Sequence, residues 1–174
     1  NGIYEWVTRN QEFQNLVRPL IQQFSPLGLT ADQVTAITLI TRSFGQYSLR
    51  GLINAALGKY GAEAKELRVF VLCIYGGLLK LRCANRGAPF YYMIKDRKRN
   101  TQLCTTNKTF KLTKFMGVST NSVGEPESLI LKITGNVNVF DVSGFKGTEH
   151  YVMGPEVKIT AKNVTDRGTY TEVE

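Results

Sequence analysis

The sequence is poor in histidine and cysteine, the residues on which many catalytic and metal sites depend. Among its 174 residues are one histidine, His150, and three cysteines. The spacing of Cys73, Cys83 and Cys104 fits neither a zinc ribbon nor a redox CxxC pair. A single histidine without suitably spaced cysteine or carboxylate partners does not build the usual metal site. We therefore expect free thiols, no metal and no cofactor.

Long apolar runs and nucleotide-binding glycine motifs are also missing. The longest apolar stretch, VFVLCIYGGLL at 69–79, is much shorter than the roughly 20 residues of a membrane-spanning helix. No GxxxxGK[ST] or GxGxxG motif occurs. The opening residues NGIYEWVTRN lack the pattern of a signal peptide, so we expect a soluble intracellular protein. Only a formal cysteine–histidine pair remains as a nucleophile, and we expect that the chain is not an enzyme.

Basic charge, in contrast, is abundant and concentrated. The net charge is +8, and residues 80–114 hold ten of the 22 basic residues but one acid, Asp96. The 12 basic and 13 acidic residues elsewhere nearly cancel. Because a solvated surface usually mixes both signs, this segregation favours a polyanionic partner such as nucleic acid, an anionic membrane or an acidic protein.

The periodicity of apolar residues changes partway along the chain. The first 25 residues have helical spacing, and QVTAITLITRSF at 33–44 is rich in β-branched residues and predicts a strand. YSLRGLINAALGKYG has an apolar stripe at i, i+3, i+4 and i+7 and predicts a helix. A second, buried helix is predicted to end near Gly76 and Gly77, with a strand at 69–75 as the alternative.

Five segments of the second half have strand-like patterns, separated by Gly, Asn, Pro and Asp: 89–95, 109–118, 128–142, 156–164 and 169–173. Helices followed by strands predict an α+β fold, in which a mostly antiparallel sheet from the C-terminal half packs against two or more N-terminal helices. We predict an N-terminal helical arm at 1–28 and one α+β core domain at 29–174.

The segment PFYYMIKDRKRN combines three aromatic residues with a cluster of basic ones. In a strand, Phe90 and Tyr92 share one face, which we expect to enter the core, and Tyr91 points the other way. The polar residues that follow predict an exposed loop. The candidate binding residues for an anionic membrane or a nucleocapsid are those of the loop and the next strand, namely Lys95, Arg97, Lys98, Arg99, Lys108, Lys111 and Lys114.

The order of elements is similar to that of rhabdovirus matrix proteins, most of all those of plant-infecting rhabdoviruses. The similarity covers residues 33–142 and is based on ITLITRSF, YSLRGLINAAL, GKYGAEAK and LRVFVLCIYGGLLKL, followed by a β-rich half. The resemblance implies a non-enzymatic structural protein that self-associates, binds the inner membrane surface through its basic loop and condenses the viral ribonucleoprotein. The PPxY and PTAP motifs of many members are missing.

The same resemblance implies the partners and the location. The partners would be further copies of the chain, the viral ribonucleoprotein and anionic membrane lipid, with a viral glycoprotein and RNA as further candidates. The location would be the virion and the host cytoplasm, at the inner face of a membrane, with the nucleus as an alternative. Trp6, Phe13 and Phe24 are the candidate self-association residues, with packing inside their own chain as the alternative. The alternative function is an RNA-binding nucleocapsid or coat protein.

Overall fold

The computed structural model confirms the α+β class, with helices in the N-terminal half and mostly antiparallel strands in the C-terminal half. It describes residues 2–42, 49–60, 65–81, 88–112, 114–122, 124–135, 137–147, 149–154 and 157–174. The chain divides into a helical unit, residues 1–82 with 140–149, and a β unit, residues 83–139 with 150–174. The expected boundary at residue 28 stays a prediction.

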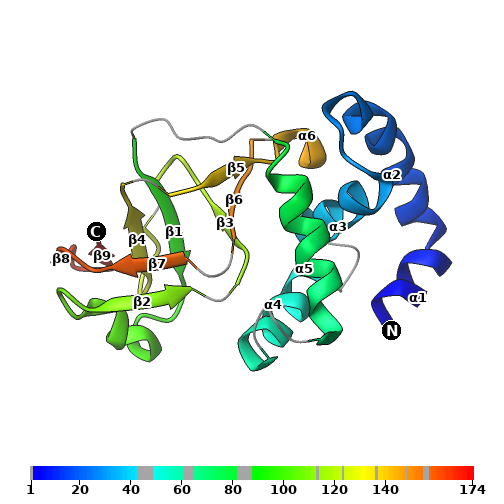
Figure 1. Cartoon of the computed structure of the whole chain (residues 1–174). Coiled ribbons are helices and arrows are strands. Elements are labelled where there is room, and N and C mark those ends of the chain that lie inside the picture. The colour runs from blue at the N-terminus through cyan, green and yellow to red at the C-terminus, as the bar shows by residue number, and fades with distance from the viewer. Residues whose placement is uncertain are drawn as a thin grey trace. The chain divides into compact units, whose positions relative to one another are not determined.

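The helical unit consists of α1 (Gly2–Arg9), α2 (Gln11–Phe24), η1 (Ser25–Leu27), α3 (Ala31–Thr41), α4 (Leu49–Tyr60), α5 (Lys65–Leu78) and the short α6 (Ser143–Lys146) (Figure 1). Two predictions are confirmed here, because α4 follows the apolar stripe and α5 is a helix that ends next to the glycine pair. The expectation that α5 is buried is wrong for one side of the helix, where Val69 and Leu72 are exposed. None of the helices in the described part of the chain combines the length and hydropathy that a membrane crossing requires.

The prediction of a strand at 33–44 is wrong, because residues 31–41 form α3. A capping box begins this helix: the Thr30 side chain accepts from Gln33 N at 3.2 Å, and the Gln33 side chain accepts from Thr30 N at 3.0 Å. Thr38 Oγ1 donates to Val34 O at 2.7 Å, which satisfies a hydroxyl that is buried. Local capping and burial therefore outweigh the β-branched composition.

The segment at 140–149 returns to the helices through α6. The Phe145 ring is fully buried and stacks on the Phe24 ring, with 4.1 Å between centroids and 7° between planes. Arg42 Nε donates to Phe145 O at 2.7 Å. These contacts join two parts of the chain that are about a hundred positions apart into one unit.

The helix α5 approaches α3 closely at its C-terminal glycines. A Cβ at Gly77 would lie 2.6 Å from Ile37 Cδ1, closer than any ordinary contact. A side chain at this position would require Ile37 and Gln33 of α3 to shift. The small residues therefore serve helix packing.

The candidate self-association residues lie on the first two helices. Phe13 and Phe24 are buried in the helical unit, and the Trp6 ring lies 5.3 Å from that of Phe13, centroid to centroid. The structure thus places these aromatic residues against their own chain, which is the alternative that the sequence left open.

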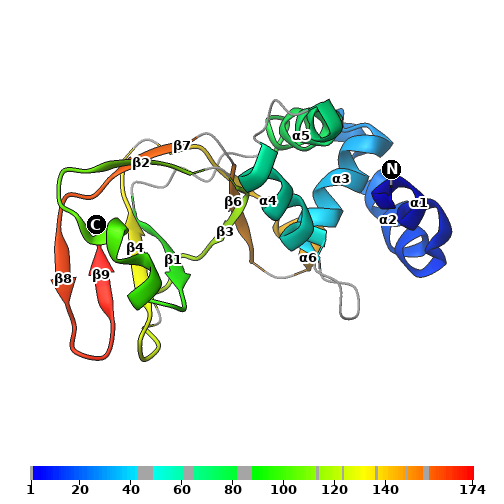
Figure 2. The same cartoon turned by 90° about the horizontal axis from the view of Figure 1, so that it is seen from below.

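Among the described residues nine strands form three sheets, and all of them except residues 140 and 141 belong to the β unit (Figures 1 and 2). The first sheet has the strand order β1-β4-β9-β8, with β1 (Phe90–Ile94), β4 (Leu129–Ile133), β9 (Thr171–Val173) and β8 (Val164–Asp166). The ribbon β2-β7 comprises β2 (Thr109–Leu112) and β7 (Val157–Thr160). The third sheet has the strand order β3-β6-β5, with β3 (Met116–Val118), β6 (Tyr151–Met153) and β5 (Val139–Asp141).

The run at 109–118, predicted as one strand, forms two strands that belong to different sheets. Residues 109–112 pair with β7, and residues 116–118 pair with β6. The same division occurs at 128–142 and 156–164. The core between these strands includes the buried side chains of Phe90, Met116, Val118, Leu131 and Met153.

Candidate functional site

The strand β1 meets the end of β3 at one pair of residues. Tyr91 N donates to Ser119 O at 2.8 Å, and Ser119 N donates to Tyr91 O at 2.9 Å. This reciprocal pair is an isolated antiparallel bridge outside the named ladders. It holds Tyr91 and Ser119 directly opposite each other.

The strand β6 runs along β3 on the other side. The register pairs Met116 with Met153, Gly117 with Val152 and Val118 with Tyr151. Continuing this antiparallel register by one position sets His150 opposite Ser119. The backbones of Tyr91, Ser119 and His150 therefore form a row across three neighbouring chain segments, and we call these residues the polar row.

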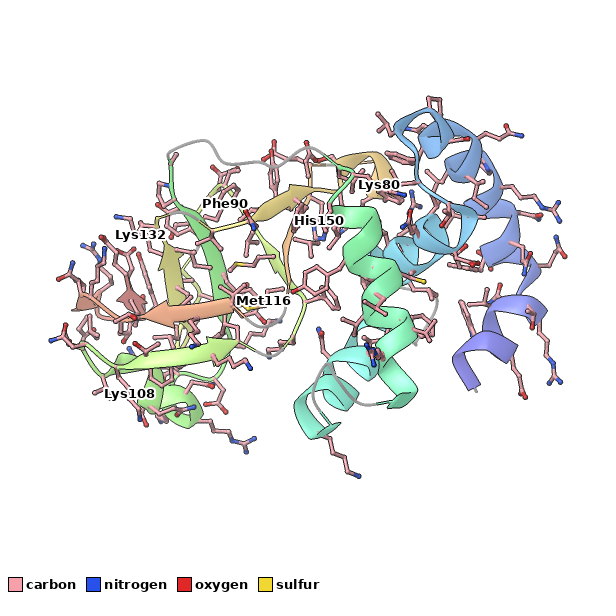
Figure 3. All side chains as sticks on the ribbon, viewed as in Figure 1. Lys80, Phe90, Lys108, Met116, Lys132 and His150 are labelled. Carbon is pink, nitrogen blue, oxygen red and sulfur yellow. The ribbon has the colours of Figure 1, made fainter. Side chains whose placement is uncertain are left out.

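The polar row faces away from the core of the β unit. Phe90 and Met116, both labelled in Figure 3, are buried in that core together with Val118. Tyr151 packs against the same core, and its ring lies 5.5 Å from that of Phe90, centroid to centroid. Successive side chains of a strand alternate between faces. Tyr91 follows Phe90, Ser119 follows Val118, and His150 precedes Tyr151. The side chains of the row therefore point to the face opposite the core.

The polar row presents three side chains that are able to form hydrogen bonds with a ligand. A phenol, a hydroxyl and an imidazole each donate or accept. The Ser119 side chain is exposed at the start of a turn, where its Oγ accepts from Asn121 N at 3.1 Å. His150 is half-buried, with its Nε2 shielded from solvent. The row thus includes a solvent-facing hydroxyl and a partly buried imidazole.

Enzymes that transfer groups also commonly use a carboxylate or a thiolate. Glu149, which is exposed, precedes His150 in the chain. Burial raises the pKa of Cys104, although the nearby Arg97 lowers it, and burial followed by the charge of Asp32 raises the pKa of Cys73. Thiolates are therefore scarce at neutral pH for both. Among the described residues, no group of three or more His, Cys, Asp or Glu side chains could hold a metal.

The β unit also contains a cavity of about 170 Å³ with an apolar lining that includes Phe110, Leu131 and Ile159. This volume is below the 300–1,000 Å³ typical of ligand pockets. None of the polar-row residues lines it. The cavity is therefore a feature separate from the row.

The predicted basic loop contains regular structure, although its polar composition indicates an exposed loop. Its residues enter a short 3-10 helix, η2 (Lys98–Cys104). Lys95, Lys98 and Arg99 are exposed, and Arg99 Nε lies 3.2 Å from Asp96 Oδ2. Arg97 is half-buried and pairs with Glu127 at 3.6 Å. The four cations therefore do not form one exposed cluster.

The other three candidate cations are spread over separate positions. Lys108 precedes β2, with its Nζ 5.3 Å from the centroid of the Phe110 ring. Lys111 lies on the exposed face of β2, and Lys114 lies between β2 and β3. Of these seven predicted binding residues, none belongs to the polar row.

Phe90 and Tyr92 pack in the core, as strand alternation predicts, with Tyr91 on the opposite face, whereas the row itself is not among the predicted sites. One signal was present: the polar run STNS directly follows the strand residues MGV. A run of this kind at the end of a strand indicates side chains placed by a scaffold for binding. The pairing partners of that strand were not readable from the sequence.

The comparisons with known proteins identify solved structures of the same fold. No protein-family model and no curated protein sequence matches the chain. Plx2a, an ADP-ribosyltransferase toxin from Paenibacillus larvae, is 14% identical with a TM-score of 0.61, covering 94% of this chain and 96% of that one. The C3 exoenzyme of Clostridium limosum is 13% identical with a TM-score of 0.55, covering 92% and 94%.

A third solved structure contains a nucleotide analogue. Exoenzyme S from Pseudomonas aeruginosa, in complex with human 14-3-3 protein beta and bound to carba-NAD, is 16% identical with a TM-score of 0.63. The alignment covers 96% of this chain and 82% of that one. Likeness at this level of identity establishes the fold and nothing further.

These likenesses correct several predictions made from the sequence. The resemblance to rhabdovirus matrix proteins is wrong, and so are both the matrix function and the nucleocapsid alternative. The partners inferred from that resemblance, which include the viral ribonucleoprotein and membrane lipid, are wrong as well. The prediction that the chain is not an enzyme is contradicted as well, because the matching structures are of transferases. From end to end, the chain has the fold of solved ADP-ribosyltransferases.

Proposed function

We propose that the chain is an ADP-ribosyltransferase that takes ADP-ribose from NAD and transfers it to an acceptor. The observation that carries the proposal is the fold likeness, which extends over 92–96% of the chain in three enzymes or toxins. The carba-NAD bound to exoenzyme S supports NAD as the donor.

The proposed reaction breaks the bond between C1′ of the ribose and the nicotinamide nitrogen. Nicotinamide leaves with the bonding electrons, and positive charge develops on C1′ and the ring oxygen. An acceptor nucleophile then forms the new bond to C1′ and gives up a proton. An oxocarbenium-like transition state of this kind is stabilised by a carboxylate and by fixed hydrogen-bond donors and acceptors.

The polar row offers a set of groups that fits a ribose. The hydroxyls of Tyr91 and Ser119 match ribose hydroxyls in hydrogen-bonding capacity. The His150 imidazole is suited to accept the proton of the acceptor, because histidine is the side chain that most often transfers protons in catalysis. The carboxylate nearest to the row along the chain is that of Glu149, which directly precedes His150.

A second candidate is an NAD-binding module that does not transfer ADP-ribose. One observation favours it: none of the three residues in the polar row is a carboxylate. If Glu149 does not reach the reacting carbon, the row could bind the donor but would not stabilise charge at C1′.

The test is to incubate the full chain with NAD and to follow binding and turnover separately. The thermal midpoint reports binding, because a ligand that binds only the folded state raises it. Chromatography of free nicotinamide reports bond breaking, and the intact mass of the chain reports self-modification. Binding with nicotinamide release supports the transferase, and binding without release supports the module. The absence of binding at millimolar NAD contradicts both.

A further inference from the structure

The cavity of about 170 Å³ in the β unit is lined by residues of two different sheets. Leu131 and Ile133 belong to β4 and Val173 to β9, whereas Phe110 belongs to β2 and Ile159 to β7 of the ribbon. All five side chains are apolar, and none of the polar-row residues lines the cavity. The cavity, which we call the sheet cavity, is therefore a candidate binding site apart from the row.

The volume of the sheet cavity suits a small apolar group. An engineered cavity of about 150 Å³ in another protein, lined by leucine, isoleucine and phenylalanine, binds benzene. The sheet cavity has a similar volume, about 170 Å³, and side chains of the same kinds. It therefore has room for an apolar body of about six carbon atoms, either one ring or a short chain. Drug-sized ligands do not fit, because their pockets measure about 300–1,000 Å³.

Charged side chains line the sheet cavity as well, namely Lys132, Lys158, Lys162 and Glu174. Lys132 Nζ lies 3.1 Å from Glu174 Oε2, so these two charges neutralise each other (Figure 3 labels Lys132). Lys158 and Lys162 are exposed, and within the described residues neither forms an ion pair or a side-chain hydrogen bond. The lining therefore combines apolar walls with two cations that are available to a ligand.

Backbone hydrogen bonds fix the segment that provides Lys162. Ala161 is buried and lines the cavity; its N donates to Lys108 O at 3.2 Å, and its O accepts from Asn107 N at 2.7 Å. Lys162 N donates to Glu174 O at 2.6 Å. A wall held in this way needs little reordering when a ligand enters, which favours the binding of even a small molecule.

We propose that the sheet cavity binds a small monocarboxylate with an apolar body of about six carbon atoms, either a ring or a short chain. The apolar body occupies the space between the two sheets, and the carboxylate lies beside Lys158 and Lys162. The inference concerns a site apart from the polar row and does not depend on the proposed transferase function.

The chemistry of the lining favours this ligand over three others. An uncharged hydrocarbon would fill the cavity but would leave Lys158 and Lys162 without a counter-charge. Inorganic phosphate would pair with the lysines but would gain nothing from the apolar walls. A cation with the same apolar body would be repelled by the two lysines. A molecule that is apolar at one end and anionic at the other uses both parts of the lining.

The experiment follows the methyl NMR signals of the full chain during titration with benzoate or hexanoate. At least one acid should shift the methyl signals of Leu131, Ile133 and Ile159, with a dissociation constant of about 0.1–1 mM. Benzyl alcohol, which has the ring without the charge, should bind about threefold more weakly or worse. Acetate and benzylamine should not approach saturation at about 10 mM. Tighter benzoate identifies aromatic acids as the ligands, and tighter hexanoate identifies acyl chains; either order supports the proposal.

Three variants locate the site. K158Q/K162Q should weaken binding of the tighter acid about fivefold or more and leave benzyl alcohol within about twofold. K95Q/K98Q changes the net charge equally at exposed lysines that do not line the cavity, and it should leave both affinities within about twofold. Ala161→Leu fills part of the cavity and should weaken the acid and the alcohol alike, about tenfold or more. Circular dichroism checks that the variants fold, and the lysine variants still test the proposal if A161L does not.

Three results would overturn the proposal. The first is that neither acid causes saturable shifts of the methyl signals in the cavity lining. The second is equal weakening by K158Q/K162Q and K95Q/K98Q, or by neither, which would mean that the two cavity lysines do not recognise the carboxylate. The third is unchanged affinity in a folded A161L variant, which would place the ligand outside the cavity.

Discussion

Tyr91 and Ser119 exchange two backbone hydrogen bonds, of 2.8 and 2.9 Å, that fasten β1 to the end of β3. The bridge lies where β3 ends and a turn begins, so it fixes the backbone of a residue whose side chain is exposed. A hydroxyl held in this way loses little freedom on binding a ligand. The relationship makes Ser119 the best-placed residue of the polar row for testing the proposed NAD site.

Replacing Ser119 with alanine should lower NAD turnover and leave the fold intact. The backbone bridge to Tyr91 does not involve the side chain, and the exposed Oγ accepts one bond from Asn121 N. Loss of a hydrogen bond to the substrate is expected to reduce kcat/KM about 2- to 10-fold. Nicotinamide release measures it, and S122A, at an exposed serine three positions along, is the control. Equal activity in S119A and wild type would exclude Ser119 from the site.

Glu149→Gln should abolish transfer while NAD binding persists. The substitution keeps the shape but removes the charge that opposes the developing cation, at an expected cost of about 10²-fold or more in kcat. E125Q changes another exposed glutamate and should have no effect. If E149Q instead keeps full kcat, another carboxylate performs this role.

Phe145→Ala should destabilise the helical unit strongly. The ring is fully buried and stacks on Phe24, so its removal leaves a cavity in the place where α6 meets α2. Phenylalanine-to-alanine changes of this kind cost about 3–5 kcal/mol. Urea unfolding of F145A compared with L27A, at a leucine that is 56% exposed, measures the difference. Similar midpoints for the two variants would contradict the packing described.

Secondary structure was largely predictable where the pattern was long and regular, and less so where two signals competed. The stripe of α4 predicted a helix correctly. At α3 the β-branched residues favoured a strand, but the sequence TADQ already contained the Thr30–Gln33 capping box. An N-terminal capping signal is therefore a better guide there than composition.

Lys158→Glu should stabilise the β unit. The change converts the Lys111–Lys158 cross-strand pair from repulsive to attractive, with an expected gain of about 0.5 kcal/mol in unfolding free energy. K98E alters the net charge equally at an exposed position outside the two strands of the ribbon and serves as the control. Chemical denaturation at low salt measures both. A loss of stability specific to K158E would show that the two lysines do not repel each other.

Stability should fall at alkaline pH through the Lys132–Glu174 ion pair. Lys132 Nζ donates to Glu174 Oε2 at 3.1 Å, and this hydrogen bond, followed by the charge of Glu174, raises the pKa of Lys132 above 10.5 (Figure 3 labels Lys132). A raised folded-state pKa gives stabilisation that is complete below about pH 10.5 and is lost as pH rises through the folded value.

The variant Lys132→Gln should show a smaller drop in unfolding midpoint between pH 9 and pH 11 than the wild type. K98Q, at an exposed lysine of the η2 segment, should behave like the wild type. An unchanged drop in K132Q would mean that the ion pair does not contribute to the alkaline transition.

The polar row could not be found from the sequence, for a physical reason. Its three residues come from chain segments about 30 positions apart, and their meeting depends on which strands pair. The apolar patterns of β1, β3 and β6 fix which side chains face the core but do not specify the neighbour of each strand. The strand at 109–118 illustrates this, since its two halves join different sheets.

The most direct test of the central claim is a proton NMR time course of NAD with the full chain. If the chain is an ADP-ribosyltransferase, free nicotinamide appears in proportion to the concentration of the chain, and its rate of release falls in S119A and E149Q but not in S122A or E125Q. NAD that remains intact would contradict the transferase function, and nicotinamide release that persists unchanged in S119A and E149Q would contradict the proposed site.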